Sequence, residues 1–186
     1  MNTLEDAWRW YGDARASLRR LERIGEKWWD HVPWGQAPWK GDRRFVDLSK
    51  ESVIESAVNA REHLDDVAVV VLFSVFEATV REVVLDQIAR EEGAVRHRSI
   101  IDAIEKAKGR VREGSFFAVL EPFKPIAVTL IEEVNQVRRF RNWVSHGKRG
   151  RKPADVTPEI AYERLGRCLP LLVSPPNDET STEPSP

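Results

Sequence analysis

Apolar residues recur at three- and four-residue steps along several long stretches of the chain, which is the pattern of amphipathic helices. In residues 3–30 one apolar face runs through Leu4, Trp8, Tyr11, Leu18, Leu21 and Trp28. This face predicts a first helix. Two prolines and two glycines in the following WDHVPWGQAPWKGDRR predict a loop, which we place at residues 31–47. Its Trp34 and Trp39 either stack on nucleic-acid bases or cover an end of the folded domain.

The apolar pattern resumes near residue 48 and is strongest in a second stretch. Its members are Leu64, Val67, Ala68, Val71, Leu72, Val75, Phe76, Thr79, Val80, Val83 and Val84. Many of these residues are β-branched, which is typical of strands. However, the helical period persists over several turns without a turn signal, so we predict a buried central helix.

Three further segments follow the central helix, which we expect to end between residues 93 and 98. Ser99 is expected to cap a short helix over residues 100–109 that ends at Gly109. Residues 110–125 are mixed in character and are closed off by Pro122 and Pro125. A long helix is then predicted over residues 126–146.

The start of the last helix is predicted at Thr157 and Pro158, which are a favourable N-cap residue and a favourable first helical residue. Its predicted buried face comprises Ala161, Leu165, Cys168, Leu169 and Leu172, and Pro170 is expected to bend it. Residues 174–186 are rich in proline and polar side chains and are predicted to be disordered. The prediction is therefore one all-α domain over residues 1–173, an up-and-down bundle of about five helices.

Composition narrows the class of protein. A chain of 186 residues with 41% hydrophobic content can bury one core. The net charge of −1 argues against overall attraction to nucleic acid but allows local basic patches. Cys168 is the only cysteine, and neither a signal peptide nor an apolar run of about 20 residues occurs. We therefore expect a cytoplasmic protein without a membrane segment.

The helix over residues 126–146 carries the most informative chemistry. Its apolar residues are Leu130, Val134, Val137 and Val144, and Arg141 falls in the middle of their stripe. A guanidinium directed towards a core is costly unless it is paired or faces a cleft. One such partner is Glu77, beside the apolar seam of the central helix. His146 follows one turn after Asn142, and Gly147 is a plausible C′ residue.

These residue types can support cleavage of RNA without a metal. Histidine acts as base or acid near neutral pH, while arginine matches a phosphoryl group and stays charged. Asn142 is expected to orient the imidazole or hold a phosphate. Seven basic residues and no acidic one lie between Arg138 and Lys152, a patch suited to a polyanion. The scattered histidines and acids show no metal-ligand spacing, so neither a metal nor a cofactor is expected.

A structural interpretation of the same residues stays open. Arg141 would then be a core arginine satisfied by Glu77. His146 would be a favourable charge at the negative end of the helix dipole. The basic KRGRK segment at residues 148–152 would be a solvated linker.

Two strings resemble a known family. RNWVSHG, residues 141–147, is similar to the R-x(4–6)-H motif of HEPN domains, in which a polar residue commonly follows the arginine. LFSVFEATVRE, residues 72–82, resembles the matching helix of HEPN families from prokaryotic defence and toxin–antitoxin loci, above all the RiboL-PSP-HEPN and MAE-28990-like groups. The likeness extends over roughly residues 60–172 in helix order and leaves out the tryptophan-rich N-terminal segment.

The resemblance implies a homodimeric helical bundle that cleaves RNA without metal and leaves 2′,3′-cyclic phosphate ends. Arg141 and His146 would be catalytic, Asn142 would support them, and Glu77 would hold Arg141. Contacts to the RNA backbone are expected from basic residues of the patch, namely Arg138, Lys148, Arg149 and Arg151. The family acts in toxin–antitoxin systems and antiviral defence, so an antitoxin or defence partner is implied. It also contains inactive members, so the alternative is a non-catalytic module for dimerisation or binding.

Overall fold

The computed structural model describes residues 2–34, 36 and 48–173. The helices in this part of the chain are α1 (Leu4–Arg23), α3 (Lys50–Glu92), α4 (Arg98–Glu113), α5 (Phe116–Leu120), α6 (Lys124–Ser145) and α7 (Pro158–Val173). No strand occurs within these ranges, so the predicted all-α fold is confirmed. The described part has six helices instead of about five because the mixed stretch before α6 contains the short α5.

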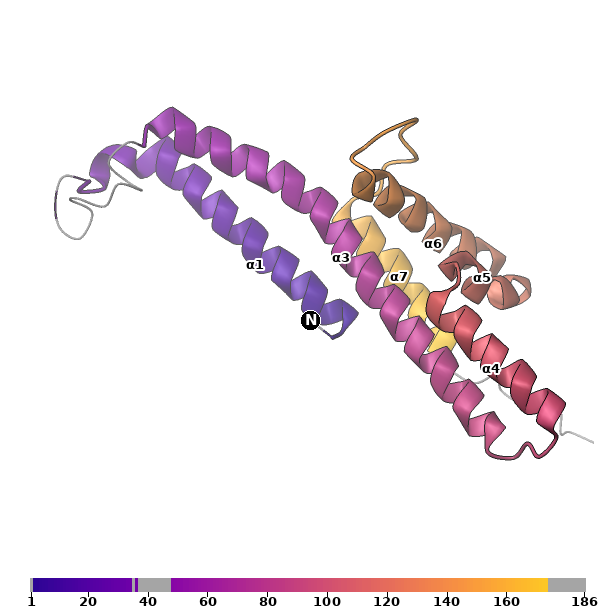
Figure 1. Ribbon diagram of the computed structural model, residues 1–186. Coiled ribbons are helices and arrows are strands. Elements are labelled where there is room, and N and C mark those ends of the chain that lie inside the picture. Colours follow the sequence, from indigo (N-terminus) through magenta and orange to yellow (C-terminus); the bar gives the residue numbers. More distant parts are fainter. Residues whose placement is uncertain (1, 35, 37–47, 174–186) are drawn as a thin grey trace, which may run out of the picture.

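Helix α3 is the spine of the molecule. Its 43 residues correspond to a length of about 65 Å, and every other long helix packs against it. Helix α1 lies along its first half, α4 folds back along its last turns, and α6 and α7 pack against its middle (Figure 1). Side chains from α3 consequently face several neighbours at once, which explains the almost continuous apolar run in its sequence.

The core lies where α3, α5, α6 and α7 meet. Phe73 and Phe76 of α3 are buried against Phe116 of α5, which stands edge-on to both at centroid distances of 5.6 and 5.9 Å. Helix α6 contributes Ile131, Val134, Val137 and Phe140, and α7 contributes Ala161, Leu165, Cys168 and Leu172. The predicted buried face of α7 is therefore confirmed, with Leu169 packed at its edge.

Burial along α3 differs in detail from the single predicted face. Val67, which belongs to that face, is 46% exposed. Conversely, Val69 and Phe73 lie outside the predicted face and are buried. The difference arises because α3 is covered from more than one direction, so no single stripe describes its buried surface.

Helix α1 and the first turns of α3 form an arm that projects beyond α6 and α7 (Figure 1). The near end of the predicted α1 face is buried at Leu4 and Tyr11. At the far end the prediction is wrong, because Leu21 is 48% and Trp28 is 53% exposed. Among the described residues, α1 and α3 are the long helices of the arm, and no third long helix covers the rest of its apolar face.

The tryptophan-rich segment is described only up to residue 34 and at residue 36. The indole N–H of Trp34 donates to the carbonyl oxygen of Trp29 at 2.9 Å, and the two ring centroids lie 4.6 Å apart. This packing agrees with the interpretation that Trp34 covers an end of the fold. Trp39, like the rest of 37–47 and the tail at 174–186, lies outside the described residues.

Helix α4 corrects two predicted boundaries. It begins at Arg98 with His97 as its N-cap, not at Ser99, and it continues through Gly109 to Glu113. Gly109 is tolerated because the residues around it favour helix and Lys108 anchors the helix to Glu92 of α3. The helix ends instead at Gly114, which is extended and donates its N–H to the carbonyl of Arg110.

The predicted start of the last helix is confirmed. The hydroxyl oxygen of Thr157 accepts the backbone N–H of Ile160 at 3.3 Å, and Pro158 is the first residue of α7. Pro170 lies inside the helix, on its exposed side. Within the described ranges, no helix combines the length and apolar character needed to cross a membrane.

Candidate active site

Helix α6 places Arg141 at the edge of the core. Val137 and Val134, one and two turns earlier on the same face, are fully buried. The guanidinium of Arg141 lies 5.5 Å from the ring centroid of Phe73, close enough for a cation–π contact. The side chain is nevertheless 30% exposed. Arg141 therefore lies against the core while part of its side chain reaches solvent.

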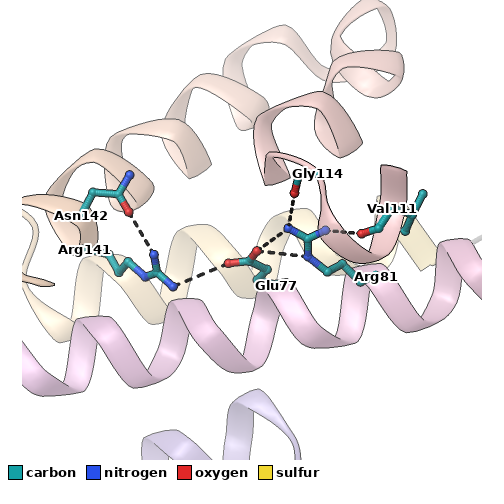
Figure 2. Close-up of polar contacts among 6 residues, drawn as sticks. All are labelled: Glu77, Arg81, Val111, Gly114, Arg141 and Asn142. Atoms are coloured by element: carbon teal, nitrogen blue, oxygen red, sulfur yellow. Dashed lines mark hydrogen bonds and ion pairs between the residues drawn. The ribbon is translucent and has the colours of Figure 1, made fainter. Parts of the chain in front are cut away.

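Glu77 of α3 stands between two guanidinium groups (Figure 2). Its Oε1 accepts hydrogen bonds from Arg81, at 2.6 Å from Nη2 and 3.1 Å from Nε. Its Oε2 lies 3.8 Å from Nη2 of Arg141, an ion pair without a hydrogen bond. The pairing of Glu77 with Arg141 that the sequence suggested is thus present, but Arg81 is the closer partner.

Arg81 holds this carboxylate in place, a role that was not predicted from the sequence. Besides contacting Glu77, it donates to the backbone carbonyls of Val111 and Gly114 (Figure 2). Its guanidinium also lies 5.5 Å from the ring centroid of Phe116. The four-residue spacing from Glu77 is the sequence signal that could have revealed the pair.

Asn142 fixes the other side of the Arg141 guanidinium. Its Oδ1 accepts a hydrogen bond from Nη1 of Arg141 at 3.0 Å (Figure 2). The hydrogen bond that we find for this amide is therefore with Arg141 and not with the imidazole of His146. The Nε of Arg141 is buried and has no hydrogen-bond partner among the described residues.

His146 is the C-cap of α6 and is exposed. Five residues along an α-helix rotate the side-chain direction by about 140°. The imidazole and the Arg141 guanidinium therefore leave the helix in different directions. Within the described part of the chain, no hydrogen bond joins the imidazole to Arg141 or Asn142. One copy of the chain thus carries both groups at the same helix end, and no hydrogen bond links them among the described residues.

Helix α6 is terminated by the glycine predicted from the sequence, Gly147. Gly147 adopts a positive φ of 72° and donates its N–H to the carbonyl of Val144 at 2.9 Å. The N–H of Lys148 reaches the carbonyl of Trp143 at 2.8 Å. These two bonds form a Schellman motif, which confirms Gly147 as the C′ residue. The motif fixes how the basic loop leaves the helix.

The four predicted RNA contacts fall into two groups. Lys148 is held by Asp66 at 2.5 Å, and Nε of Arg138 donates to the buried Asn135 at 3.2 Å. Arg149 and Arg151 are exposed and have no ion-pair or hydrogen-bond partner within the described ranges. Two of the predicted contacts thus have structural partners, and two are available to a ligand.

Among residues 2–34, 36 and 48–173, no three histidine, cysteine or acidic side chains are grouped so that they could hold a metal ion. Comparison with protein-family models, with curated protein sequences and with solved structures finds no match for the chain. The chemistry of the site must therefore be argued from its own residues.

Proposed function

We propose that the protein is a metal-independent endoribonuclease of the HEPN type, acting in the cytoplasm as a toxin or antiviral defence component. The observation that carries the proposal is the state of Arg141. Its guanidinium is held by one hydrogen bond and one longer ion pair, its side chain remains 30% exposed, and the exposed His146 follows five residues later at the end of the same helix. It can therefore accept a phosphate without first breaking a fully buried ion pair.

The proposed reaction is an internal transfer at phosphorus. His146 removes the proton of the ribose 2′-hydroxyl, and the 2′-oxygen attacks the adjacent phosphorus. The bond from phosphorus to the 5′-oxygen of the next nucleotide breaks, and that oxygen takes a proton from a general acid. The products are a 2′,3′-cyclic phosphate and a free 5′-hydroxyl. Arg141 stabilises the negative charge that grows on the non-bridging oxygens in the transition state.

The proposal includes a homodimer. A spacing of five residues in an ideal helix separates the side-chain directions by about 140°, so we infer that one copy does not complete the constellation. The HEPN resemblance implies that two copies place their helix ends in a shared cleft. A second copy would then supply the general acid and enclose the substrate, and an antitoxin or defence partner would regulate the cleft.

The test compares total RNA from cells that produce the wild-type chain or His146→Ala. His63→Ala, which removes an exposed histidine of α3, is the matched control. We expect the His146 variant to lose cleavage by a factor on the order of 10²–10⁴, the usual share of a general acid or base, with an unchanged helical CD spectrum. Cleavage by the purified wild type should persist in EDTA. Equal cleavage by wild type and His146→Ala would remove His146 from the mechanism.

A second candidate function is a non-catalytic helical module for dimerisation or binding. It is favoured by the set of contacts that Arg141 makes with Glu77, Asn142 and Phe73, which give the residue a structural role without any substrate. Transformation of bacteria separates the two functions. An active toxin should give many fewer transformants than its Arg141→Ala variant, whereas a scaffold should give equal numbers.

A further inference from the structure

A shallow basic hollow lies on the side of α6 that faces away from Arg141. It has a volume of about 480 Å³ and is lined by Gln136, Arg139, Arg151, Lys152, Pro153 and Ala154. The first two residues belong to α6 and the others to the loop that leads to α7 (Figure 1). Three of the six lining residues are cationic and none is acidic, so the hollow is suited to an anion.

The cations of the hollow form only weak ion pairs with other residues or none among the described residues. Lys152 pairs with Asp155 at 2.5 Å, and Arg139 pairs with Glu132. All four side chains of these pairs are about half exposed or more, and such surface pairs contribute only about 0–1 kcal/mol. Arg151 has no ion-pair or hydrogen-bond partner within the described part of the chain. An incoming anion can therefore recruit all three cations at low cost.

One neutral donor lines the hollow, and a second lies on the same face of α6 outside the lining. The Oε1 of Gln136 accepts a hydrogen bond from Arg164 of α7 at 2.9 Å, which fixes the amide and leaves its NH₂ group as a donor. Trp143 lies one turn after Arg139 on the same face, beneath the loop, with the ammonium of Lys152 6.0 Å from its ring centroid. Its buried indole N–H has no acceptor among the described residues. The lining of the hollow therefore presents donors, and the carboxylates that compete for them are Glu132, paired with Arg139, and Asp155, paired with Lys152.

The position of the hollow relates it to the proposed cleavage site. Gln136, Arg139 and Trp143 share one face of α6, roughly 160° from the direction of Arg141. His146, however, follows Arg139 by seven residues, so it leaves the helix close to the same face and about 10 Å further along the axis. A strand that passes over the imidazole can continue along this face into the hollow.

We propose that the hollow binds a backbone phosphate of the RNA strand that flanks the phosphate cut at His146. This inference rests on the proposed ribonuclease function and adds Gln136, Arg139 and Lys152 to the surface that holds the substrate. The neighbouring Lys148 forms an ion pair with Asp66 and is not part of the hollow.

The test measures binding of a short fluorescein-labelled oligouridylate by fluorescence anisotropy as a function of salt concentration. All proteins carry His146→Ala so that the probe is not cut. Arg151→Ala should weaken binding about fivefold and reduce the slope of log K against log salt by about 0.7, as expected for one lost phosphate contact to a single strand. Arg19→Ala removes an exposed arginine of α1 that has no ion-pair partner within the described ranges, and it should leave both quantities unchanged.

Several outcomes would overturn the inference. Unchanged binding by Arg151→Ala would remove the hollow from the RNA path while leaving a cleavage activity of the wild type untouched. An equal loss in Arg149→Ala would show that the whole loop acts as a diffuse cation. Equally tight binding of polyglutamate would assign the hollow to an acidic protein partner. Conversely, a wild type that binds RNA through Arg151 but does not cut it would support the hollow and refute the nuclease.

Discussion

Replacing Glu77 by glutamine is the most informative perturbation of the candidate site, because one carboxylate serves two guanidinium groups. The substitution keeps the size of the side chain and removes its charge. Glu77 is 21% and Arg81 is 17% exposed, so their two hydrogen bonds are screened only in part. Hydrogen bonds to charged groups contribute about 1.5–3 kcal/mol, and we expect the free energy of unfolding to fall by about 2 kcal/mol.

The two halves of this cluster should contribute unequally. Arg81 approaches Glu77 to 2.6 Å and donates twice, whereas Arg141 stays at 3.8 Å, where the Coulomb attraction in water is about 1 kcal/mol. With Arg141 at 30% exposure, we expect a coupling energy of about 0.5 kcal/mol for Glu77 with Arg141. The coupling energy with Arg81 should be about 1.5 kcal/mol.

The assay is a pair of double-mutant cycles in urea, followed by far-UV CD. One cycle combines Glu77→Gln with Arg81→Met and the other combines it with Arg141→Met. The cycle isolates the pair, so the bonds of Arg81 to Val111 and Gly114 cancel. A stronger coupling of Glu77 to Arg141 than to Arg81 would refute the reasoning. It would also make Arg141 a structural ion-pair partner instead of a residue available to phosphate.

Two further predictions concern packing and ionisation. A Cβ at Gly25 would lie 2.6 Å from Cγ1 of Ile54, so Gly25→Ala should lower the free energy of unfolding in urea by about 1–3 kcal/mol. Gly109 has open space around it, so Gly109→Ala should raise the free energy of unfolding by about 0.5–1 kcal/mol. Equal effects of the two substitutions would contradict the packing around Gly25. Burial raises the pKa of Cys168 from its ordinary 9.0 to about 11, so its stabilising contribution is complete below pH 9 and lost as pH rises towards 11. The urea midpoint of the wild type should therefore fall more steeply across this range than that of Cys168→Ala, and parallel curves would contradict the raised pKa.

Local chemistry explains which parts of the fold could be predicted from sequence. Gly147 and Thr157 act through bonds within a few residues, so their cap roles followed directly from their types. Gly109 was wrongly predicted to end its helix. A glycine inside a helix costs only about 1 kcal/mol, which a tertiary contact such as that of Lys108 with Glu92 can offset. The exposure of Leu21 and Trp28 was not predicted, because periodicity identifies an apolar face but not how far its packing partner extends along it.

The candidate site was predictable only in part. The types and spacing of Arg141, Asn142 and His146 indicated their shared helix end, and the position of Glu77 beside the apolar seam suggested its pairing. The four-residue spacing signals the pairing of Arg81 with Glu77, but the further bonds that fix Arg81 were not predictable, because they go to backbone carbonyls of Val111 in the last turn of α4 and of Gly114 just after it. The basic hollow was missed for a similar reason, since the path of the loop after α6 brings Arg151 and Lys152 next to Gln136 and Arg139.

The sharing of Glu77 has a consequence for charge balance. Two guanidinium groups and one carboxylate leave the trio of Arg81, Glu77 and Arg141 with one unit of positive charge. A phosphodiester carries one negative charge, so its arrival at Arg141 would make the trio electrically neutral. A dianion, such as a terminal phosphate, would instead leave it negative. If the cluster binds a phosphate as proposed, its charge is therefore matched by a phosphate in the interior of a strand and exceeded by one at a strand end.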